Sequence, residues 1–170
     1  MVASSWATSA ATRRSMLGNR SRDTAPELAL RSALHARGFR YRVDARPIAE
    51  FRRRADIVFT RLRVAVFVDG CFWHGCPLHY RVPTLNADYW RPKIQRNRVR
   101  DLETTECLSA AGWTVLRFWT HEPTAQMLAE TMRAVNQQRA RLGLAAIPAA
   151  AAALRSVPTN GMSGGATNLE

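Results

Sequence analysis

The order of hydrophobic and polar positions predicts helices and short strands in the first half of the chain. Leucines recur at helical spacing behind a capping-box sequence and a glycine ends the pattern, so a helix is predicted over 24–37. Apolar residues alternate with arginines over 39–43, which is typical of a strand with one buried face. Two nearly continuous apolar runs, 55–59 and 62–68, predict central strands.

The second half of the chain adds a long helix, another strand and a final helix. The long helix is predicted over 87–111, with Asn86 as its candidate N-cap and a glycine after its end. A strand is predicted over 113–119 and an amphipathic helix over 123–142. This order of elements predicts an α/β fold in which helices flank a small mixed central β-sheet.

Length and composition favour one folded domain. With 170 residues, 46% of them hydrophobic and 22% charged, the chain fits a single domain over 23–143, and no apolar run reaches the roughly 20 residues needed to cross a bilayer. Residues 1–22 form a basic arm, and the composition of 144–170 predicts a disordered tail. The N-terminus lacks the apolar segment of a secretory signal, so we expect a cytoplasmic protein.

The charge balance favours a polyanionic partner. Twenty-five cations against 13 anions give a net charge of +12, and all the cations except Lys93 are arginines. These arginines are spread through the predicted elements, which suggests a basic face laid along a nucleic-acid backbone. The alternative is a generally solvated basic surface.

A short loop string, CFWHGCPLHY, gathers the residue types that bind zinc. It holds two of the three cysteines and two of the four histidines: Cys71, His74, Cys76 and His79. Structural zinc takes about four sulfur and nitrogen ligands, often several from one loop and the rest from elsewhere. His121 follows the predicted strand 113–119 and is the natural distant ligand. The predicted set is therefore Cys71, Cys76, His79 and His121.

Other interpretations of these residues remain open. The two loop cysteines could be small buried hydrophobic residues and the histidines hydrogen-bonded polar groups. Leaving His74 out of the zinc set frees it as a proton acceptor; alternatively, His74 is the ligand and His79 is exposed. Cys107 lies within the long helix and is expected to be packed. Three cysteines are too few for a disulfide framework.

Three carboxylates form a second candidate constellation. Asp56 lies inside an apolar strand, where an unpaired charge is costly. Asp69 ends the next strand, and Glu27 lies near the start of the first helix. Carboxylates at one edge of adjacent strands are a common way to build a Mg²⁺ site for phosphodiester hydrolysis. The alternatives are an ion pair between Asp56 and one of the arginines at 52–54, and a capping role alone for Glu27.

Large aromatic side chains lie beside arginines in the same region. Phe72 and Trp73 are in the loop, and Tyr89 and Trp90 are near the start of the long basic helix. Such side chains can stack on bases or wedge between base steps.

These motifs resemble the very short patch repair (Vsr) mismatch endonuclease family, part of the PD-(D/E)xK nuclease fold. The similarity runs from Met16 through RDTAPE, ADIVF and VFVDGCFWHGC, then through the helix motif DYWxxKIxxNxxRD, to AGWTVLRFW and His121. It implies a restriction-endonuclease-like fold with a zinc-bound loop. It also implies a monomeric, nucleoid-associated enzyme that nicks double-stranded DNA 5′ of the thymine in T:G mismatches left by 5-methylcytosine deamination, with other repair proteins as further partners.

The resemblance also implies roles for catalytic residues. Asp56 and the backbone carbonyl of Val68 would bind Mg²⁺, Glu27 would position the metal-bound water, and His74 would act as general base or proton carrier. The best-described members carry Thr-His in place of Val68-Asp69, so Asp69 becomes a candidate metal ligand in the catalytic set. The zinc loop of those members is one residue longer and has a different order of His and Cys.

For DNA binding, the resemblance implies contacts along the loop and the long helix. Aromatic side chains would enter the duplex beside the mismatch, and Met16 would approach from the opposite groove. The implied DNA-binding residues are Met16, Phe72, Trp73, Trp90, Lys93 and Arg96. Two other functions remain open: an endonuclease of the same fold directed by sequence or structure without mismatch preference, and a non-catalytic zinc-stabilised DNA-binding module.

Overall fold

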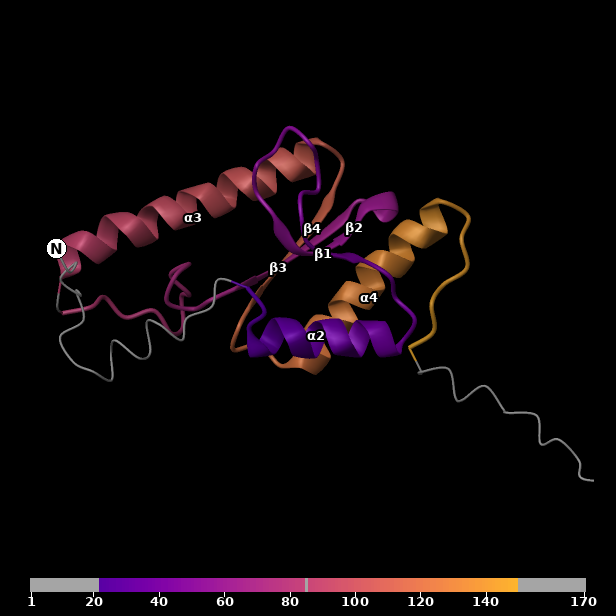
Figure 1. Cartoon of the computed structure of the whole chain (residues 1–170), viewed down its shortest axis with the longest axis horizontal. Coiled ribbons are helices and arrows are strands. Elements are labelled where there is room, and N and C mark those ends of the chain that lie inside the picture. The colour runs from indigo at the N-terminus through magenta and orange to yellow at the C-terminus, as the bar shows by residue number, and fades with distance from the viewer. Residues whose placement is uncertain (1–21, 85, 150–170) are drawn as a thin grey trace, which may run out of the picture.

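The computed structural model describes residues 22–84 and 86–149, and a four-stranded sheet lies at its centre (Figure 1). The strands are β1 (Arg42–Ala45), β2 (Ala55–Phe59), β3 (Val64–Asp69) and β4 (Thr114–Trp119), in spatial order β1-β2-β3-β4. The first three pair antiparallel, whereas β3 and β4 pair parallel. The predicted mixed sheet is therefore confirmed.

Helices cover both faces of this sheet. Figure 1 shows α2 (Ala25–Ala36) and α4 (Thr124–Arg141) side by side on one face and α3 (Ala87–Ala110) on the other. The core under α2 and α4 includes Leu30 and Val66, and a smaller core under α3 includes Phe67 and Leu108. The first half of α3 extends beyond the sheet, next to loop 70–84.

The first strand is shorter than predicted. Phe39 does not belong to it, because its backbone N–H donates to the Leu34 carbonyl at 3.1 Å in the turn that closes α2. Its side chain is fully buried and meets the Phe59 ring edge-on, with centroids 6.3 Å apart. The alternating pattern over 39–43 thus predicted the burial of Phe39 correctly. It placed the start of the strand three residues too early, since β1 begins at Arg42.

A second difference lies between β2 and β3. Residues Thr60–Leu62 form a 3-10 turn, and Arg63 adopts a left-handed conformation with φ of 51°. Leu62 therefore packs against the core from a turn rather than from a strand. The predicted strand over 55–59 matches β2, and the other elements agree with the prediction to within two residues.

Alternation along β3 decides which side chains reach the functional face. Val66 and Val68 point into the core under α2 and α4. Phe67 belongs to the core under α3, and Asp69, two residues further on, follows the same alternation. In the parallel register, Phe67 lies opposite Arg117 of β4. Asp69 of β3 and Arg117 of β4 therefore both lie on the α3 side of the sheet.

The predicted arm and tail lie mostly outside the described residues. The structure does not describe residues 1–21, which include Met16, or residues 150–170. Beyond α4, Ile147 packs against the larger core, and its backbone N–H donates to the Asn136 side-chain oxygen at 2.8 Å. Within the described ranges, no helix is long and apolar enough to span a membrane.

Candidate active site and metal-binding cluster

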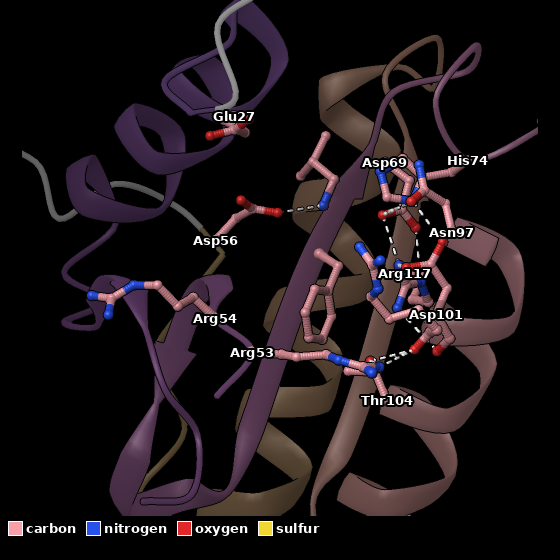
Figure 2. Close-up of a pocket in the computed structure, with 13 residues that line it drawn as sticks. Glu27, Arg53, Arg54, Asp56, Asp69, His74, Asn97, Asp101, Thr104 and Arg117 are labelled. Atoms are coloured by element: carbon pink, nitrogen blue, oxygen red, sulfur yellow. Dashed lines mark hydrogen bonds and ion pairs between the residues drawn. The ribbon is translucent and has the colours of Figure 1, made fainter. Parts of the chain in front are cut away.

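A cavity of about 340 Å³ opens between the sheet and α3 and contains most of the predicted catalytic groups. Glu27, Asp56, Asp69 and His74 all line it, as does Val68. Figure 2 shows Glu27 and Asp56 on one side of β3, and Asp69 and His74 on the other. The structure therefore brings together in one cavity the carboxylates and the histidine that sequence reasoning singled out.

Asp56 lies near the start of β2 and is held by the backbone of the neighbouring strand. Its Oδ2 accepts a hydrogen bond from the Val68 N–H at 2.7 Å. Burial, the largest influence, raises the pKa of Asp56 to about 6, and the negative charges of Glu27 and Asp69 add to the rise despite the Val68 hydrogen bond. The charge of Arg31 lowers this pKa least of all the influences, so no nearby cation offsets the burial of the Asp56 carboxylate.

The alternative in which Asp56 pairs with one of the arginines at 52–54 is not observed in the described part of the chain. Arg53 donates to the Thr104 hydroxyl and pairs with Glu103. Arg54 pairs with Asp44, 2.9 Å away.

Glu27 is buried in the first turn of α2 and combines a structural role with a place in the cavity. Its Oε1 accepts the Thr24 hydroxyl at 2.8 Å, and its Oε2 accepts the Asp23 N–H at 3.0 Å. The Arg31 guanidinium pairs with Oε2 at 2.8 Å. The predicted capping-box residues therefore interact, but Thr24 makes no side-chain hydrogen bond to the helix backbone. Asn86, the candidate cap of α3, likewise makes none.

His74 lies at the other side of the cavity, hydrogen bonded to a residue of α3. Its Nδ1 is 2.6 Å from Oδ2 of Asp101 and 3.5 Å from Oδ1 of Asp69. Burial, the largest influence, lowers the pKa of His74, but the Asp101 hydrogen bond and the Asp69 charge outweigh it, so the net pKa is raised. Burial raises the pKa of Asp101, and the hydrogen bond from His74 together with Arg117 brings it below its usual value.

Asp69 is engaged by an arginine. Arg117 Nε lies 2.8 Å from Asp69 Oδ2, and Arg117 Nη2 lies 2.8 Å from Asp69 Oδ1. Sequence reasoning assigned no role to Arg117 or Asp101. The available signal was the one used for Asp56, a charged residue inside an apolar strand, since Arg117 stands between Leu116 and Phe118.

The four predicted zinc ligands come together at the end of β4. The ligand atoms of Cys71, Cys76, His79 and His121 all lie within 4.8 Å of one another. Their sulfur-to-nitrogen distances range from 3.1 to 4.0 Å. Tetrahedral zinc with Zn–S of about 2.3 Å and Zn–N of about 2.0 Å would separate these atoms by about 3.5 Å. The donor set and its spacing therefore fit a zinc ion.

His74 does not point into this cysteine–histidine cluster, although it lies between the two cysteines in sequence. Its Nδ1 faces Asp101 and Asp69 instead. Of the two arrangements that the sequence left open, the geometry matches the one that separates His74 from the cluster. Cys107, which was expected to be packed, is exposed on α3.

Loop 70–76 folds tightly against α3. The His74 N–H donates to the Gly70 carbonyl at 3.1 Å, and the Cys76 N–H donates to the Cys71 carbonyl at 2.9 Å. Gly75 has φ of +66°, and a Cβ there would lie 3.0 Å from the Arg98 Cδ. Glycine is therefore required both for the turn and for the close approach of α3.

An aromatic cluster lies where the loop meets the first turn of α3. The Phe72, Trp73 and Trp90 rings contact one another edge-on, with centroids 5.2 to 5.6 Å apart. The Lys93 ammonium lies 5.4 Å from the Trp73 ring and 5.1 Å from the Trp90 ring. Arg96 is exposed further along α3. Four of the predicted DNA-binding residues thus form one surface.

Comparison with known proteins gives this arrangement a family. The sequence pattern of the family described as "DNA mismatch endonuclease Vsr" matches residues 6–79. The chain is 53% identical over 111 residues to the type II nicking enzyme V.NaeI of Lentzea aerocolonigenes, which covers 64% of this chain and 67% of that relative. It is 44% identical to the type II nicking enzyme V.NmeDIP of Neisseria meningitidis serogroup C, with 63% and 72% covered.

A further relative carries the mismatch name. The chain is 38% identical over 100 residues to the DNA mismatch endonuclease Vsr of Escherichia coli strain K12, with 58% of this chain and 62% of the relative covered. These similarities define the protein as a DNA endonuclease. It belongs to the Vsr family. Membership of a nuclease family speaks against the non-catalytic DNA-binding module.

Proposed function

We propose that this endonuclease nicks one strand of duplex DNA 5′ of the thymine in a T:G mismatch, by Mg²⁺-dependent hydrolysis, as the first step of very short patch repair. The observation that carries the hydrolytic part is the uncompensated carboxylate of Asp56, in the same cavity as Glu27 and His74. The mismatch part rests on the aromatic cluster and on the similarity to a relative named as a mismatch endonuclease.

Mg²⁺ would be held by the Asp56 carboxylate and the Val68 carbonyl. Both residues line the cavity, and oxygen donors with several retained waters are what Mg²⁺ prefers. When bound, it would neutralise charge on the phosphate and lower the pKa of a coordinated water. Glu27 faces Asp56 (Figure 2) and would orient that water through a hydrogen bond. Arg31 and Thr24 already fix the Glu27 carboxylate, so it would not need to reorganise.

His74 would move the proton. With Nδ1 engaged by Asp101, Nε2 is the ring nitrogen left to exchange a proton at the scissile phosphate. A histidine oriented by a carboxylate is a common general acid–base arrangement. The Asp101 hydrogen bond and the Asp69 charge raise the pKa of His74 against the effect of burial, which favours the proton-carrying form of the ring.

Zinc would organise the loop that carries these groups. Cys71 and Cys76 lie on either side of Phe72, Trp73 and His74 in sequence, and the loop contributes only Cys76 to the buried apolar set. A closed set of two thiolates and two imidazoles suits a structural rather than a catalytic zinc. The metal would therefore fix the DNA-facing aromatics and the histidine together.

Mismatch preference would come from deformation. A T:G wobble pair stacks less well than a matched pair, so inserting Phe72, Trp73 and Trp90 beside it costs less than in matched DNA. Lys93 and Arg96 would contact the strand from α3. Met16, predicted to approach from the opposite groove, lies outside the described residues.

A second candidate is nicking at a defined sequence without mismatch preference. The observation in its favour is that relatives at 53% and 44% identity are named type II nicking enzymes. The two functions share the cavity and differ only in what the aromatic cluster and the basic face select.

A nicking assay on two duplexes of identical flanking sequence separates them. The wild-type protein with Mg²⁺ is expected to nick the T:G duplex much faster than the T:A duplex, and chelation of Mg²⁺ should stop the reaction. Equal rates on both duplexes would overturn the mismatch proposal in favour of the sequence-directed one. Full activity of an Asp56→Ala variant would overturn the proposed metal site.

A further inference from the structure

Arg117 connects three elements at the cavity. Its guanidinium makes a bidentate pair with Asp69 of β3, both contacts at 2.8 Å. Its Nη2 also lies 2.9 Å from Oδ1 of Asp101 on α3. The guanidinium carbon is 4.7 Å from the Phe67 ring centroid, directly across the β3–β4 register. These contacts from three directions leave the guanidinium a single orientation.

The two carboxylates that Arg117 joins are not equivalent. Asp69 uses both oxygens on Arg117 and has 9% of its side chain exposed. The Asp101 carboxylate gives Oδ1 to Arg117 and Oδ2 to the His74 Nδ1, at 2.6 Å, and the Asp101 backbone carbonyl accepts a hydrogen bond from Arg117 Nη1 at 3.4 Å. Asp69 is thus the anchor for the arginine and lies 3.5 Å from the His74 Nδ1, whereas Asp101 makes the closer contact and transmits the position of the arginine to the histidine.

We propose that Arg117 is a positioning residue of the nicking reaction: anchored by Asp69, it fixes the Asp101 carboxylate so that Oδ2 holds His74 in its working orientation. This inference rests on the role of His74 proposed above. The planar guanidinium suits the task because it can bind one carboxylate with two parallel donors and still reach a second, whereas a lysine ammonium lacks the planar fork that matches a carboxylate.

The same geometry assigns Asp69 a different role from metal binding. Asp69, His74 and Asp101 offer three ligand atoms within 4.8 Å of one another, which is compatible with a cation. The Arg117 guanidinium already supplies a positive charge there and occupies both Asp69 oxygens. A divalent ion in that place would have to displace it. Asp69 therefore compensates Arg117, and the carboxylate whose burial no nearby cation offsets is Asp56.

The test is a double-mutant cycle between Arg117 and His74. Arg117→Met keeps an apolar chain over Phe67 but removes the bridge to Asp101. We expect the single-turnover nicking rate at saturating enzyme to fall by about 10²-fold, with the duplex Kd changed by less than about threefold. In a His74→Ala background, Arg117→Met should cost less than about twofold more, because it acts through the histidine. Arg117→Lys should restore only part of the rate.

A spectroscopic readout reports the positioning itself. The His74 Nδ1 proton should give a downfield resonance, identified by its loss in His74→Ala. That resonance should disappear in Arg117→Met and persist in Arg133→Met, a matched change of an exposed arginine on α4. If Arg117→Met unfolds the protein because Asp69 is left as an unpaired buried charge, the double variant Asp69→Asn/Arg117→Met removes both charges. It then takes the place of the single variant in every measurement.

Three outcomes would overturn the inference. A normal rate for folded Arg117→Met would do so, and so would an equal loss from Arg117→Met with and without His74, which would mean a direct contact with the phosphate. A Mg²⁺ or Mn²⁺ requirement that shifts in Asp69→Asn but not in Asp56→Asn would restore Asp69 as a metal ligand. Failure of the wild type to nick either duplex would remove the proposed function itself and is seen before any variant is compared.

Discussion

Asn97 and Asp101, one turn apart on α3, hold two consecutive residues of the loop. Asn97 Nδ2 donates to the Trp73 carbonyl at 2.8 Å, and Asp101 Oδ2 lies 2.6 Å from His74 Nδ1. Residues four apart on a helix share a face, so one face of α3 fixes both the aromatic cluster and His74. Any shift of the loop along α3 would move Trp73 and His74 together.

Replacing Asp56 should affect activity and stability in opposite directions. Asp56→Asn removes the proposed metal ligand, so nicking should fall by at least about 10²-fold while DNA binding persists. The same change should stabilise the metal-free protein at pH 7.5 by up to about 3 kcal/mol, because it removes a buried charge whose pKa is raised. Urea unfolding in a chelator, together with the nicking assay, measures both.

The pH dependence of this effect has a defined sign. The pKa of Asp56 is raised from 3.8 to about 6 on folding, so the folded state favours the protonated acid. The contribution of Asp56 to stability is therefore greatest below pH 3.8 and is lost as the pH rises through about 6. Stabilisation of Asp56→Asn over wild type should thus shrink at pH 4.5. An equal gain at both pH values would contradict the burial argument.

The cysteine–histidine cluster predicts one tightly held zinc. Protein purified without added metal should contain about one equivalent of zinc, and less than about half an equivalent would count against the site. Cys76→Ser should lose the metal and destabilise the fold by several kcal/mol, on the order of the loss of a structural site. Cys107→Ser, at an exposed position on α3, is the matched control and should change stability by less than about 0.5 kcal/mol.

The aromatic cluster should carry substrate choice rather than general affinity. Trp73→Ala and Trp90→Ala are expected to reduce nicking of the T:G duplex by at least about tenfold, because the wedge and its stacking are lost. Salt-sensitive binding to matched DNA should change little, since it depends on the arginines. Leu142→Ala removes an exposed apolar side chain at the end of α4 and serves as the control. An intact T:G preference in both tryptophan variants would contradict the wedge.

Two glycines with the same backbone conformation allow the loop packing to be measured. Gly75 and Gly143 both have φ of +66°, but only Gly75 has neighbours within 4 Å, at Arg98 and Ile94 of α3. Gly143→Ala should cost about 1 kcal/mol for the left-handed conformation alone. Gly75→Ala should cost about 1–3 kcal/mol more, since its Cβ meets a helix that must give way. Equal thermal shifts in the two variants would mean that the loop does not depend on close contact with α3.

Local patterns in the sequence were enough to predict the fold class and most of its elements. The apolar run over 55–59 became β2 without change, and the glycines after α2 and α3 mark their ends. The pattern failed at Phe39, because burial against Phe59 requires an apolar residue whether or not the backbone is extended. Hydrophobic periodicity reports which side chains are buried, and strand pairing decides where a strand begins.

The candidate site could be predicted where its residues are close in sequence or of rare type. Cys71 and Cys76 could be identified because they lie close together and cysteine is rare in this chain. His121 could be identified because the chain has only four histidines. The contact between Asp69 and Arg117 could not be predicted, because the two residues are 48 positions apart in sequence and meet only through the parallel register of β3 and β4. Asp69 in isolation resembles a metal ligand, and its partner changes its role.

The parallel pairing of β3 and β4 has a consequence for how the enzyme acquires its activity. β1, β2 and β3 are joined by short connections, whereas the chain passes through loop 70–84 and the whole of α3 before β4 can pair. Closing that long connection costs more entropy, so we expect β4 to join the sheet last. A nascent chain would then already carry Asp56 and its basic surface but not Arg117 in place, and it could bind DNA before it could cut it. Slower protection of the Thr114–Trp119 amides than of the β2 amides, in pulsed hydrogen exchange during refolding, would show this order, and simultaneous protection would refute it.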